Sequence, residues 1–161
     1  MLRALLLGCL LLLGGCASQP PLPVIAPDLQ LPRQLHVLRQ QGEQRQDWML
    51  VIQREDNALR WSLLDFLGIP QARQRLVDNQ WRADGLLPPN PQARELFAAV
   101  LFALTTPEQL ASRYPQARAM GSDRQLGERW VVHYRGADDF TLTLAQGLSY
   151  QVSPLPAEST P

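Results

Sequence analysis

Few side chains in this sequence have the type and spacing that catalysis requires. A nucleophile elbow needs Gly-x-Ser-x-Gly on a turn between a strand and a helix, and the string at positions 147–151 lacks the second glycine. We expect that string to form a strand, with Ser149 facing solvent. Asp138 and Asp139 are adjacent carboxylates, but they fall in a predicted turn, where aspartate is favoured because its side chain bonds to the nearby backbone.

Metal and phosphate chemistry have equally little support. The two histidines, His36 and His133, could pair across strands, but no cysteine or clustered carboxylate accompanies them in the sequence. We therefore expect both histidines to be structural. The sequence also has no glycine-rich phosphate loop. We predict that the protein is not an enzyme and that it needs neither a cofactor nor a metal.

One acidic residue interrupts an apolar run. Asp65 lies in the middle of positions 63–67, where the other four residues are leucine or phenylalanine. A buried carboxylate is costly unless it is paired. We therefore predict an arginine partner, Arg54 or Arg75, or exposure at a sheet edge. The functional alternative is a carboxylate that steers the head group of a ligand at the mouth of a pocket.

The first sixteen residues point to export and lipid attachment. Arg3 is followed by an apolar run from Leu5 to Leu13, then by two glycines and Cys16. This order is typical of a secretion signal, and its end on a cysteine resembles the lipobox of bacterial lipoproteins. The resemblance implies cleavage before Cys16 and lipidation of its sulfur, and two or more acyl chains hold a protein stably on a bilayer. Ala17 stands where lipoproteins retained in the inner membrane often carry Asp, which implies the periplasmic face of the outer membrane.

Two other interpretations of this segment remain open. It could be an uncleaved transmembrane anchor, although the apolar run is shorter than the roughly 20 residues that a spanning helix needs. It could also be an ordinary secretion signal that contains a cysteine by chance.

Composition limits the partners of the protein. Removal of residues 1–15 leaves 146 residues, a length that suits one domain. These residues contain fourteen arginines, no lysine and fifteen acidic side chains, for a net charge of −1. We therefore expect no nucleic-acid partner, because such proteins usually present a strongly basic face. With Cys9 in the signal and Cys16 lipidated, no thiol pair remains for a disulfide.

The order of segments predicts one domain on a tether. We expect a signal peptide over 1–15, a Pro-rich extended tether over 16–33, a single domain over 34–155 and a disordered tail over 156–161. Short apolar segments between polar turns predict strands over 35–40, 48–54, 59–67, 73–79, 80–84, 128–134, 140–145 and 148–152.

Two helices are predicted between these groups of strands. Asn90 can cap a helix that has Pro91 in its first turn and that ends near Leu104. Thr106 and Gln109 have the spacing of a capping box at the start of a second, shorter helix.

The apolar pattern predicts how these elements pack. Positions 48–52 carry apolar side chains on both faces of a strand, and positions 96–104 are apolar all round a helix, so that helix must be enclosed. We predict an α+β fold: a curved antiparallel half-barrel sheet with inserted helices that close an apolar cavity. The alternative is that helix and sheet pack into a filled core. The residues predicted to line the cavity are Trp48, Leu50, Ile52, Trp61, Leu63, Phe66, Phe97, Leu101, Trp130 and Val132.

Several segments together resemble an uncharacterised family of proteobacterial lipoproteins. They are the lipobox, the Pro-rich tether, the string Leu-Leu-Pro-Pro at 86–89 before an apolar helix, and the late strands at 129–135 and 140–144. Genes of that family are commonly found among those for aryl-polyene or related pigment biosynthesis. The resemblance covers about residues 34–152 and implies a fold similar to LolA/LolB, whose cavity receives acyl chains.

These observations lead to a functional expectation. We expect a lipoprotein on the periplasmic face of the outer membrane, anchored by acylated Cys16, that binds or accepts an acyl or polyene lipid for transfer to that membrane. The alternative is a tethered, non-enzymatic scaffold that binds envelope or biosynthetic proteins. An enzyme that acts on lipid-linked intermediates is a third possibility, for which the sequence offers no catalytic constellation.

Overall fold

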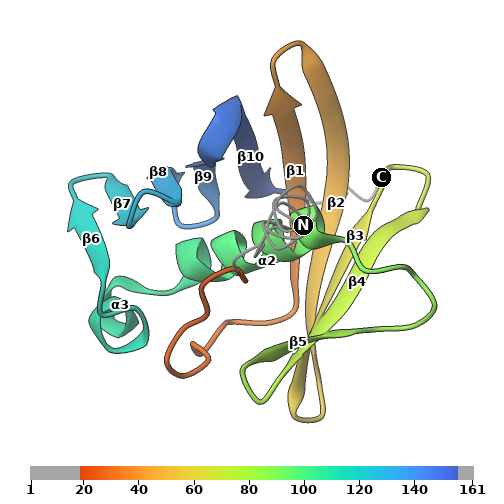
Figure 1. The fold of residues 1–161 in the computed structure, drawn as a ribbon, viewed down its shortest axis with the longest axis horizontal. Helices are drawn as coiled ribbons and strands as arrows, with labels where there is room; N and C mark the ends of the chain where they lie inside the picture. Colours follow the sequence, from red (N-terminus) through yellow and green to blue (C-terminus); the bar gives the residue numbers. More distant parts are fainter. Residues whose placement is uncertain (1–18, 156–161) are drawn as a thin grey trace, which may run out of the picture.

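The computed structural model describes residues 19–155 of the 161-residue chain, which form one ten-stranded antiparallel sheet and two α-helices (Figure 1). The strands before the helices are β1 (Arg33–Gln41), β2 (Gln44–Glu55), β3 (Ala58–Leu64), β4 (Pro70–Val77) and β5 (Gln80–Ala83). The helices are α2 (Pro91–Leu104) and α3 (Pro107–Arg113). The strands after them are β6 (Ala117–Met120), β7 (Asp123–Leu126), β8 (Trp130–Gly136), β9 (Asp139–Thr143) and β10 (Leu148–Pro154), with a short 3-10 turn η2 (Ala145–Gly147) before β10.

Some predicted features lie outside the described residues. They are the signal peptide over 1–15, the lipidation site Cys16 and the tail over 156–161.

The first and last strands of the sheet lie side by side at its centre. Its strand order is β5-β4-β3-β2-β1-β10-β9-β8-β7-β6, and in the central pair Leu35 of β1 lies opposite Pro154 of β10. The four-residue strands β5 and β6 are the two edges, so the sheet is not closed. Both helices lie between β5 and β6 in the chain and carry it from one edge to the other (Figure 1). The predicted antiparallel sheet with inserted helices is confirmed, in a structure that is mostly β.

Helix α2 forms where its cap predicts it. Oδ1 of Asn90 accepts a hydrogen bond from the backbone N–H of Ala93 at 3.0 Å, and Pro91 occupies the first turn. Every residue from Leu96 to Leu104 is buried, as an apolar helix requires. Within residues 19–155, no helix has both the length and the apolar character needed to cross a membrane.

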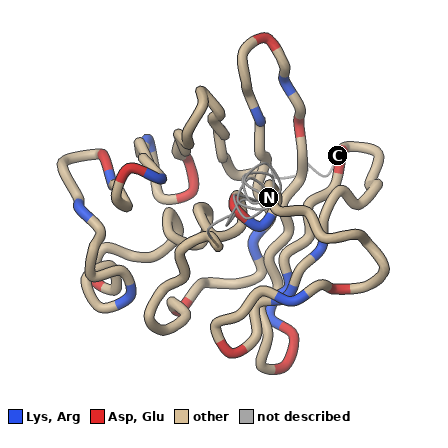
Figure 2. The backbone as a smooth tube through the Cα atoms, in the orientation of Figure 1, with Lys and Arg blue, Asp and Glu red and all other residues tan. Residues whose placement is uncertain are grey.

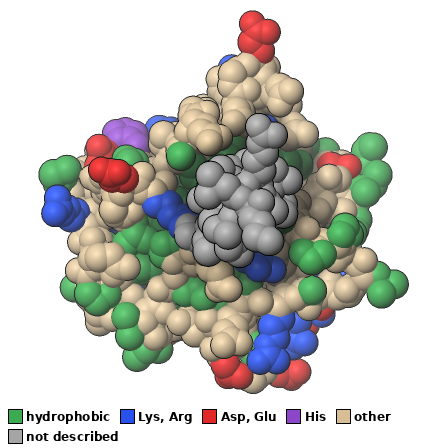
Figure 3. Space-filling model, in the orientation of Figure 1, with side chains coloured by type: hydrophobic (Ala, Val, Ile, Leu, Met, Phe, Trp, Pro, Cys, Tyr) green, Lys and Arg blue, Asp and Glu red, His purple; other side chains and the backbone are tan. Residues whose placement is uncertain are grey.

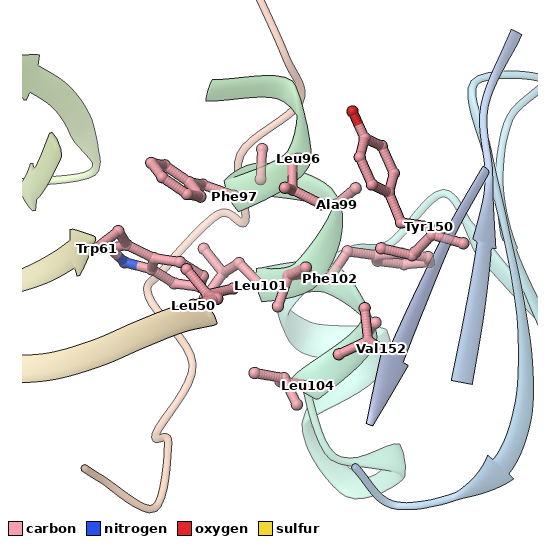
Figure 4. Close-up of a cluster of buried hydrophobic side chains, with 14 of the residues drawn as sticks. Leu50, Trp61, Leu96, Phe97, Ala99, Leu101, Phe102, Leu104, Tyr150 and Val152 are labelled. Atoms are coloured by element: carbon pink, nitrogen blue, oxygen red, sulfur yellow. The ribbon is translucent and has the colours of Figure 1, made fainter. Parts of the chain in front are cut away.

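Side chains of α2 pack against both halves of the sheet (Figure 4). The Phe97 ring lies 5.6 Å from the ring of Trp61 in β3 and 5.9 Å from that of Trp81 in β5, measured between centroids. On the other side, the Phe102 ring lies 5.9 Å from that of Trp130 in β8. Fully buried side chains therefore occupy the space between the middle of α2 and the sheet, as in a filled core.

Polar contacts fix the C-terminal end of α2 to β7 and β8. Nη1 of Arg124 donates to the carbonyl oxygens of Phe102 at 3.0 Å and Thr105 at 2.6 Å. The hydroxyl of Tyr134 donates to the carbonyl of Ala103 at 2.7 Å. The last carbonyls of a helix have no partner within the helix, so these two side chains satisfy groups that burial would otherwise leave unpaired.

A second polar contact fixes the N-terminal half of α2 to β8. Glu95 forms a two-point ion pair with Arg129, with N–O distances of 2.7 Å and 2.6 Å. The indole N–H of Trp130 donates to Oε1 of the same carboxylate at 2.6 Å. Both halves of α2 are therefore fixed to the second half of the sheet.

The described part of the Pro-rich segment, residues 19–32, lies against the domain. The N–H of Val24 donates to the carbonyl of Arg113 at 2.8 Å, and the N–H of Asp28 donates to Oε1 of Gln109 at 2.9 Å. Leu29 is buried in the core. These residues therefore pack along α3, where we expected a tether that extends away from the domain.

Three local predictions differ from the structure. Strand β3 ends at Leu64, so residues 65–67 form a turn rather than the end of a strand. Strands β6 (Ala-Arg-Ala-Met) and β7 (Asp-Arg-Gln-Leu) were not predicted, because each has four residues and neither contains a β-branched or aromatic side chain. The capping box is wrong: Thr106 is the N-cap of α3, but its side chain makes no capping bond, and the Gln109 side chain accepts from Asp28 instead.

Candidate functional site

Nine of the ten residues predicted to line a cavity lie together around α2. Eight are fully buried in the core: Leu50, Ile52, Trp61, Leu63, Phe97, Leu101, Trp130 and Val132. Figure 4 shows Trp61 and Leu50 facing α2 from the first half of the sheet. Trp48 of β2 is half-buried and packs against the same core. Phe66 is 62% exposed in the turn after β3, apart from the other nine.

A recess of about 180 Å³ opens beside the first turns of α2. Trp48 of β2, Leu63 of β3 and Leu96 of α2 form its apolar lining. Tyr150 of β10 and four amide side chains, Gln46, Gln71, Asn90 and Gln92, form its polar lining. The recess therefore combines apolar walls with groups that can hydrogen-bond to a ligand.

A wider hollow of about 620 Å³ adjoins this recess. Leu144 and Leu148 line its apolar part, and Glu95 and its partner Arg129 line its polar part. The two spaces have no lining residue in common, but Leu148 and Tyr150 are on the same face of β10 and Glu95 and Leu96 are adjacent in α2, from which we infer that the spaces are neighbours. We call the recess and the hollow together the mouth.

Arg39 of β1 lies between two residues that line the recess, although it is not itself part of the lining. It is opposite Gln46 of β2 and opposite Tyr150 of β10, so the three side chains form one row on the inner face. The side chain is only 7% exposed, and its Nη2 donates to Oε1 of Gln41 at 2.6 Å. Its buried Nε has no hydrogen-bond partner, and no carboxylate of residues 19–155 forms an ion pair with it.

Tyr150 lies beside Arg39 with a buried hydroxyl group. Its ring is fully buried, at 6.5 Å from the ring of Trp48. Its O–H has no acceptor among the described residues, and the Arg39 side chain is the donor that interacts with its oxygen. Figure 4 shows this hydroxyl pointing away from the core cluster, past Leu96. Burial raises the pKa of Tyr150 to about 12, against the opposing effect of the Arg39 cation. The hydroxyl therefore stays protonated at neutral pH and can donate.

The turn after β3 presents apolar side chains to solvent. Phe66, Leu67 and Ile69 are 62%, 86% and 53% exposed. Oδ1 of Asp65 accepts the N–H groups of Leu67 and Ile69, both at 2.9 Å, and Gly68 has the positive φ of 79° that the turn requires. We call residues 65–69 the apolar turn. The side chain of Gln71, which lines the recess, donates to Oδ2 of Asp65 at 3.2 Å, so the turn adjoins the mouth.

The contacts of Asp65 overturn one prediction. Neither Arg54 nor Arg75 pairs with this carboxylate, and the backbone of its own turn satisfies it instead. The prediction of an arginine partner is wrong because it assumes a continuous strand over 63–67, in which Asp65 would lie among apolar neighbours. Strand β3 ends at Leu64, so Asp65 lies in a turn whose N–H groups it accepts.

A groove of about 510 Å³ lies at the opposite end of α2. Leu104, Leu110 and Ala137 contribute apolar surface, and Arg124 and Tyr134 lie in its wall. Arg124 and Tyr134 are bonded to the end of α2, and among the other polar lining residues Arg33 pairs with Asp138.

The remaining candidates for chemistry are dispersed. Nε2 of His36 lies 2.8 Å from Asp47, and Nδ1 of His133 lies 2.6 Å from Asp123, so each histidine pairs with its own aspartate. Ser149 is half-buried in β10 as a strand residue. Across residues 19–155, no group of three or more His, Cys, Asp or Glu side chains could hold a metal ion.

The charges of the described residues are mixed. Acidic and basic residues are scattered over the backbone (Figure 2), and hydrophobic side chains reach the surface at several places (Figure 3). No single-sign face of the kind that binds nucleic acid is visible on the side shown.

Sequence reasoning missed Arg39. It sits between Leu38 and Gln40 in a strand with alternating burial, and one arginine among fifteen carries no local signal. Leu35, Val37 and Arg39 are spaced two residues apart, and residues two apart on a strand share a face. This spacing is the one feature of the sequence that indicates an inward-facing Arg39.

Comparisons with known proteins give no further identification. No protein-family model matches the chain, and no curated protein is similar to it. The resemblance to the half-barrel lipoproteins therefore stays a prediction.

Proposed function

We propose that this protein is a lipoprotein on the periplasmic face of the outer membrane that accepts an acyl or polyene chain in its mouth. In this proposal the unclosed sheet acts as a half-barrel of the LolA/LolB kind, acylated Cys16 holds it on the membrane, and no cofactor or catalytic step takes part. The lipid is bound, sheltered from water and passed on.

The observation that carries the proposal is the mouth beside α2. Its floor combines the half-buried side chains of Trp48, Leu144 and Leu148, and the hollow has about 620 Å³, within the range of roughly 300–1,000 Å³ that is common for ligand sites. Each methylene that leaves water contributes about 0.8 kcal/mol, so ten of them contribute about 8 kcal/mol. This is comparable to the cost of association, which is about 4–15 kcal/mol.

The filled core determines where the chain binds. Because Phe97 and Phe102 occupy the space between α2 and the sheet, the chain lies along the mouth and not through the interior. The fixed ends of α2 support the same arrangement, since binding then requires no opening of the helix.

The apolar turn supports delivery to a bilayer. Burial of one leucine or phenylalanine side chain in an apolar medium contributes about 1.5–3 kcal/mol. The bonds of Asp65 hold Leu67 outward, and Gln71 links Asp65 to the recess, so the turn and the bound chain can reach the same bilayer. The Phe66 ring lies 5.6 Å from that of His36, on the outer face of β1.

Lipid extraction and a binding titration test the main proposal. The full chain with Cys16→Ser, which lacks the predicted acylation site, is extracted for mass spectrometry and titrated with a fluorescent fatty acid. Leu148→Glu in the mouth is expected to weaken binding about tenfold or more, whereas Ala137→Glu in the groove leaves it unchanged. Empty protein that also fails to bind the probe contradicts the proposal, and loss of binding in Ala137→Glu alone assigns the chain to the groove.

Vesicle binding tests the role of the apolar turn. Leu67→Glu is expected to reduce binding of the Cys16→Ser chain to vesicles about tenfold, because one exposed leucine no longer enters the bilayer. Leu86→Glu is the matched control, since Leu86 is also fully exposed but belongs to the loop before α2. Equal losses in the two variants contradict a specific role for the turn.

The filled core also favours one alternative, a tethered scaffold that binds envelope or biosynthetic proteins. A scaffold needs no lipid space, so it predicts empty protein in the extraction experiment and capture of specific envelope proteins by the surface of the domain.

A further inference from the structure

We propose that Arg39 and Tyr150 form a binding site for the carboxylate head group of the ligand, which makes a fatty or polyene acid the preferred occupant of the mouth. This inference rests on the proposed function, because it assigns the head group of the chain that the mouth accepts. It adds a chemical class of ligand and the two residues that recognise it.

Arg39 and Tyr150 bring two buried donor groups together without an acceptor among the described residues. Arg39 has only donors, and Gln41 accepts from one of its terminal nitrogens. The Nε–H of Arg39 has no acceptor among the described residues, and neither has the hydroxyl of Tyr150. The two residues are directly opposite each other in β1 and β10, so one oxyanion can accept from both.

Arg124, the other deeply buried arginine of the described residues, has hydrogen-bond acceptors. Arg124 is 6% exposed, and its Nη1 donates to the carbonyls at the end of α2. Arg39 is 7% exposed, and although its Nη2 donates to Gln41, its buried Nε has no acceptor among the described residues. A buried charged donor without an acceptor is costly, so stability alone does not explain this arginine.

The surroundings of the recess favour negative charge. The positive end of the helix dipole of α2 lies at the recess, which Asn90, Gln92 and Ala93 line, and the first turn of α2 has no acidic residue. No carboxylate lines the recess itself. In the hollow, Glu95 is paired with Arg129 and accepts from the Trp130 indole, and Glu128 is exposed. Because Tyr150 remains protonated at neutral pH, it donates to the head group and does not repel it.

Size separates the head group from the chain. The recess has about 180 Å³, which is too small for a lipid chain but sufficient for a carboxylate with its first methylenes. The adjoining hollow, with about 620 Å³ and the apolar side chains of Leu144 and Leu148, is left for the chain. A planar guanidinium also matches the two oxygens of a carboxylate.

The test compares a fatty acid with its neutral ester. The full chain with Cys16→Ser is titrated with cis-parinaric acid, a fluorescent fatty acid with a conjugated chain, and with its methyl ester. We expect the acid to bind about tenfold or more tightly than the ester, because the ester cannot form charge-assisted bonds. Arg39→Gln should remove this preference, and Tyr150→Phe should reduce it roughly three- to tenfold, while affinity for the ester stays the same.

Control variants address charge and folding. Arg45→Gln also removes one positive charge, but from an exposed position in β2, and it should leave the preference for the acid intact. Thermal unfolding of every variant identifies those that do not fold. If Arg39→Gln does not fold, the acid-to-ester ratio in the parent chain and in Tyr150→Phe still decides the matter.

Three outcomes overturn the inference in different ways. Equal binding of acid and ester by the parent chain refutes the head-group site and leaves the proposed lipid-binding function intact. Binding of neither probe refutes both. Displacement of parinaric acid by acetate at a similar concentration assigns the site to a small free carboxylate and not to a lipid.

Discussion

Arg124→Met is the sharpest test of how α2 is fixed in the sheet. Methionine keeps the apolar stem of the side chain but removes the guanidinium that lies 5.7 Å from the centroid of Phe102 and 5.2 Å from that of Tyr134. The variant loses two bonds to the carbonyls of Phe102 and Thr105. The Phe102 carbonyl keeps a bond from the N–H of Thr105 at 3.3 Å, whereas the Thr105 carbonyl loses the shorter of the two side-chain bonds, at 2.6 Å. Bonds from a charged group contribute about 1.5–3 kcal/mol each.

These magnitudes predict a loss of about 3 kcal/mol in the free energy of unfolding, since water or a shifted side chain recovers part of the two bonds. For a domain of this size, that loss lowers Tm by about 10 °C. Thermal and urea unfolding, followed by circular dichroism, measure both quantities. The variant should keep its far-ultraviolet spectrum, because the rest of α2 stays buried.

Arg118→Met is the matched control for this experiment. Arg118 is exposed in the neighbouring edge strand β6, so its loss should change stability by no more than about 0.5 kcal/mol. If Arg124→Met falls within the same limit, the buried guanidinium does not hold the end of α2, and the account of a fixed helix fails.

Two further predictions concern the same core. Glu95→Ala should destabilise the fold by about 2 kcal/mol, because Arg129 and Trp130 lose a shared acceptor, whereas Glu128→Ala, an exposed neighbour, should have little effect in urea unfolding. Burial raises the pKa of Tyr134 and Tyr150 from 10 to about 12, so the folded protein keeps these protons when the unfolded chain releases them. Stability should therefore be complete below pH 10 and fall as the pH rises towards 12, with tyrosinate absorbance appearing together with unfolding. Tyrosinate absorbance at its ordinary pH in the folded protein contradicts that burial.

The sequence predicted those elements whose signals are local. The cap at Asn90 and the apolar run of α2 identified the longer helix, and alternating apolar positions identified eight of the ten strands of the described residues. Strands β6 and β7 were not predicted because they are short and lack strand-forming residues, and their place in the sheet depends on pairing of β7 with β8 and of β6 with β7. Local composition carries no information about such a partner.

The candidate site depends on contacts between distant residues. Arg39 becomes distinctive only because β10, more than a hundred residues later, places Tyr150 opposite it and leaves both without an acceptor. The exposed turn at 65–69 was hidden by its apolar composition, which is typical of a strand, whereas the bonds from Asp65 to Leu67 and Ile69 make it a turn. Apolar pattern reveals which residues leave water, but not whether they meet a helix, a ligand or a membrane.

The central pair of β1 and β10 has a consequence for the order of folding. Leu35 needs Pro154 and Gln41 needs Leu148 as cross-strand neighbours, so the two halves of the sheet cannot join until nearly the whole chain has emerged. During synthesis, β1 exposes an unpaired edge while α2 has only half of its packing surface. Contacts so far apart in sequence slow folding. A nascent chain held in this state has the apolar residues of α2 partly uncovered, so it depends on protection from aggregation until the last strand arrives.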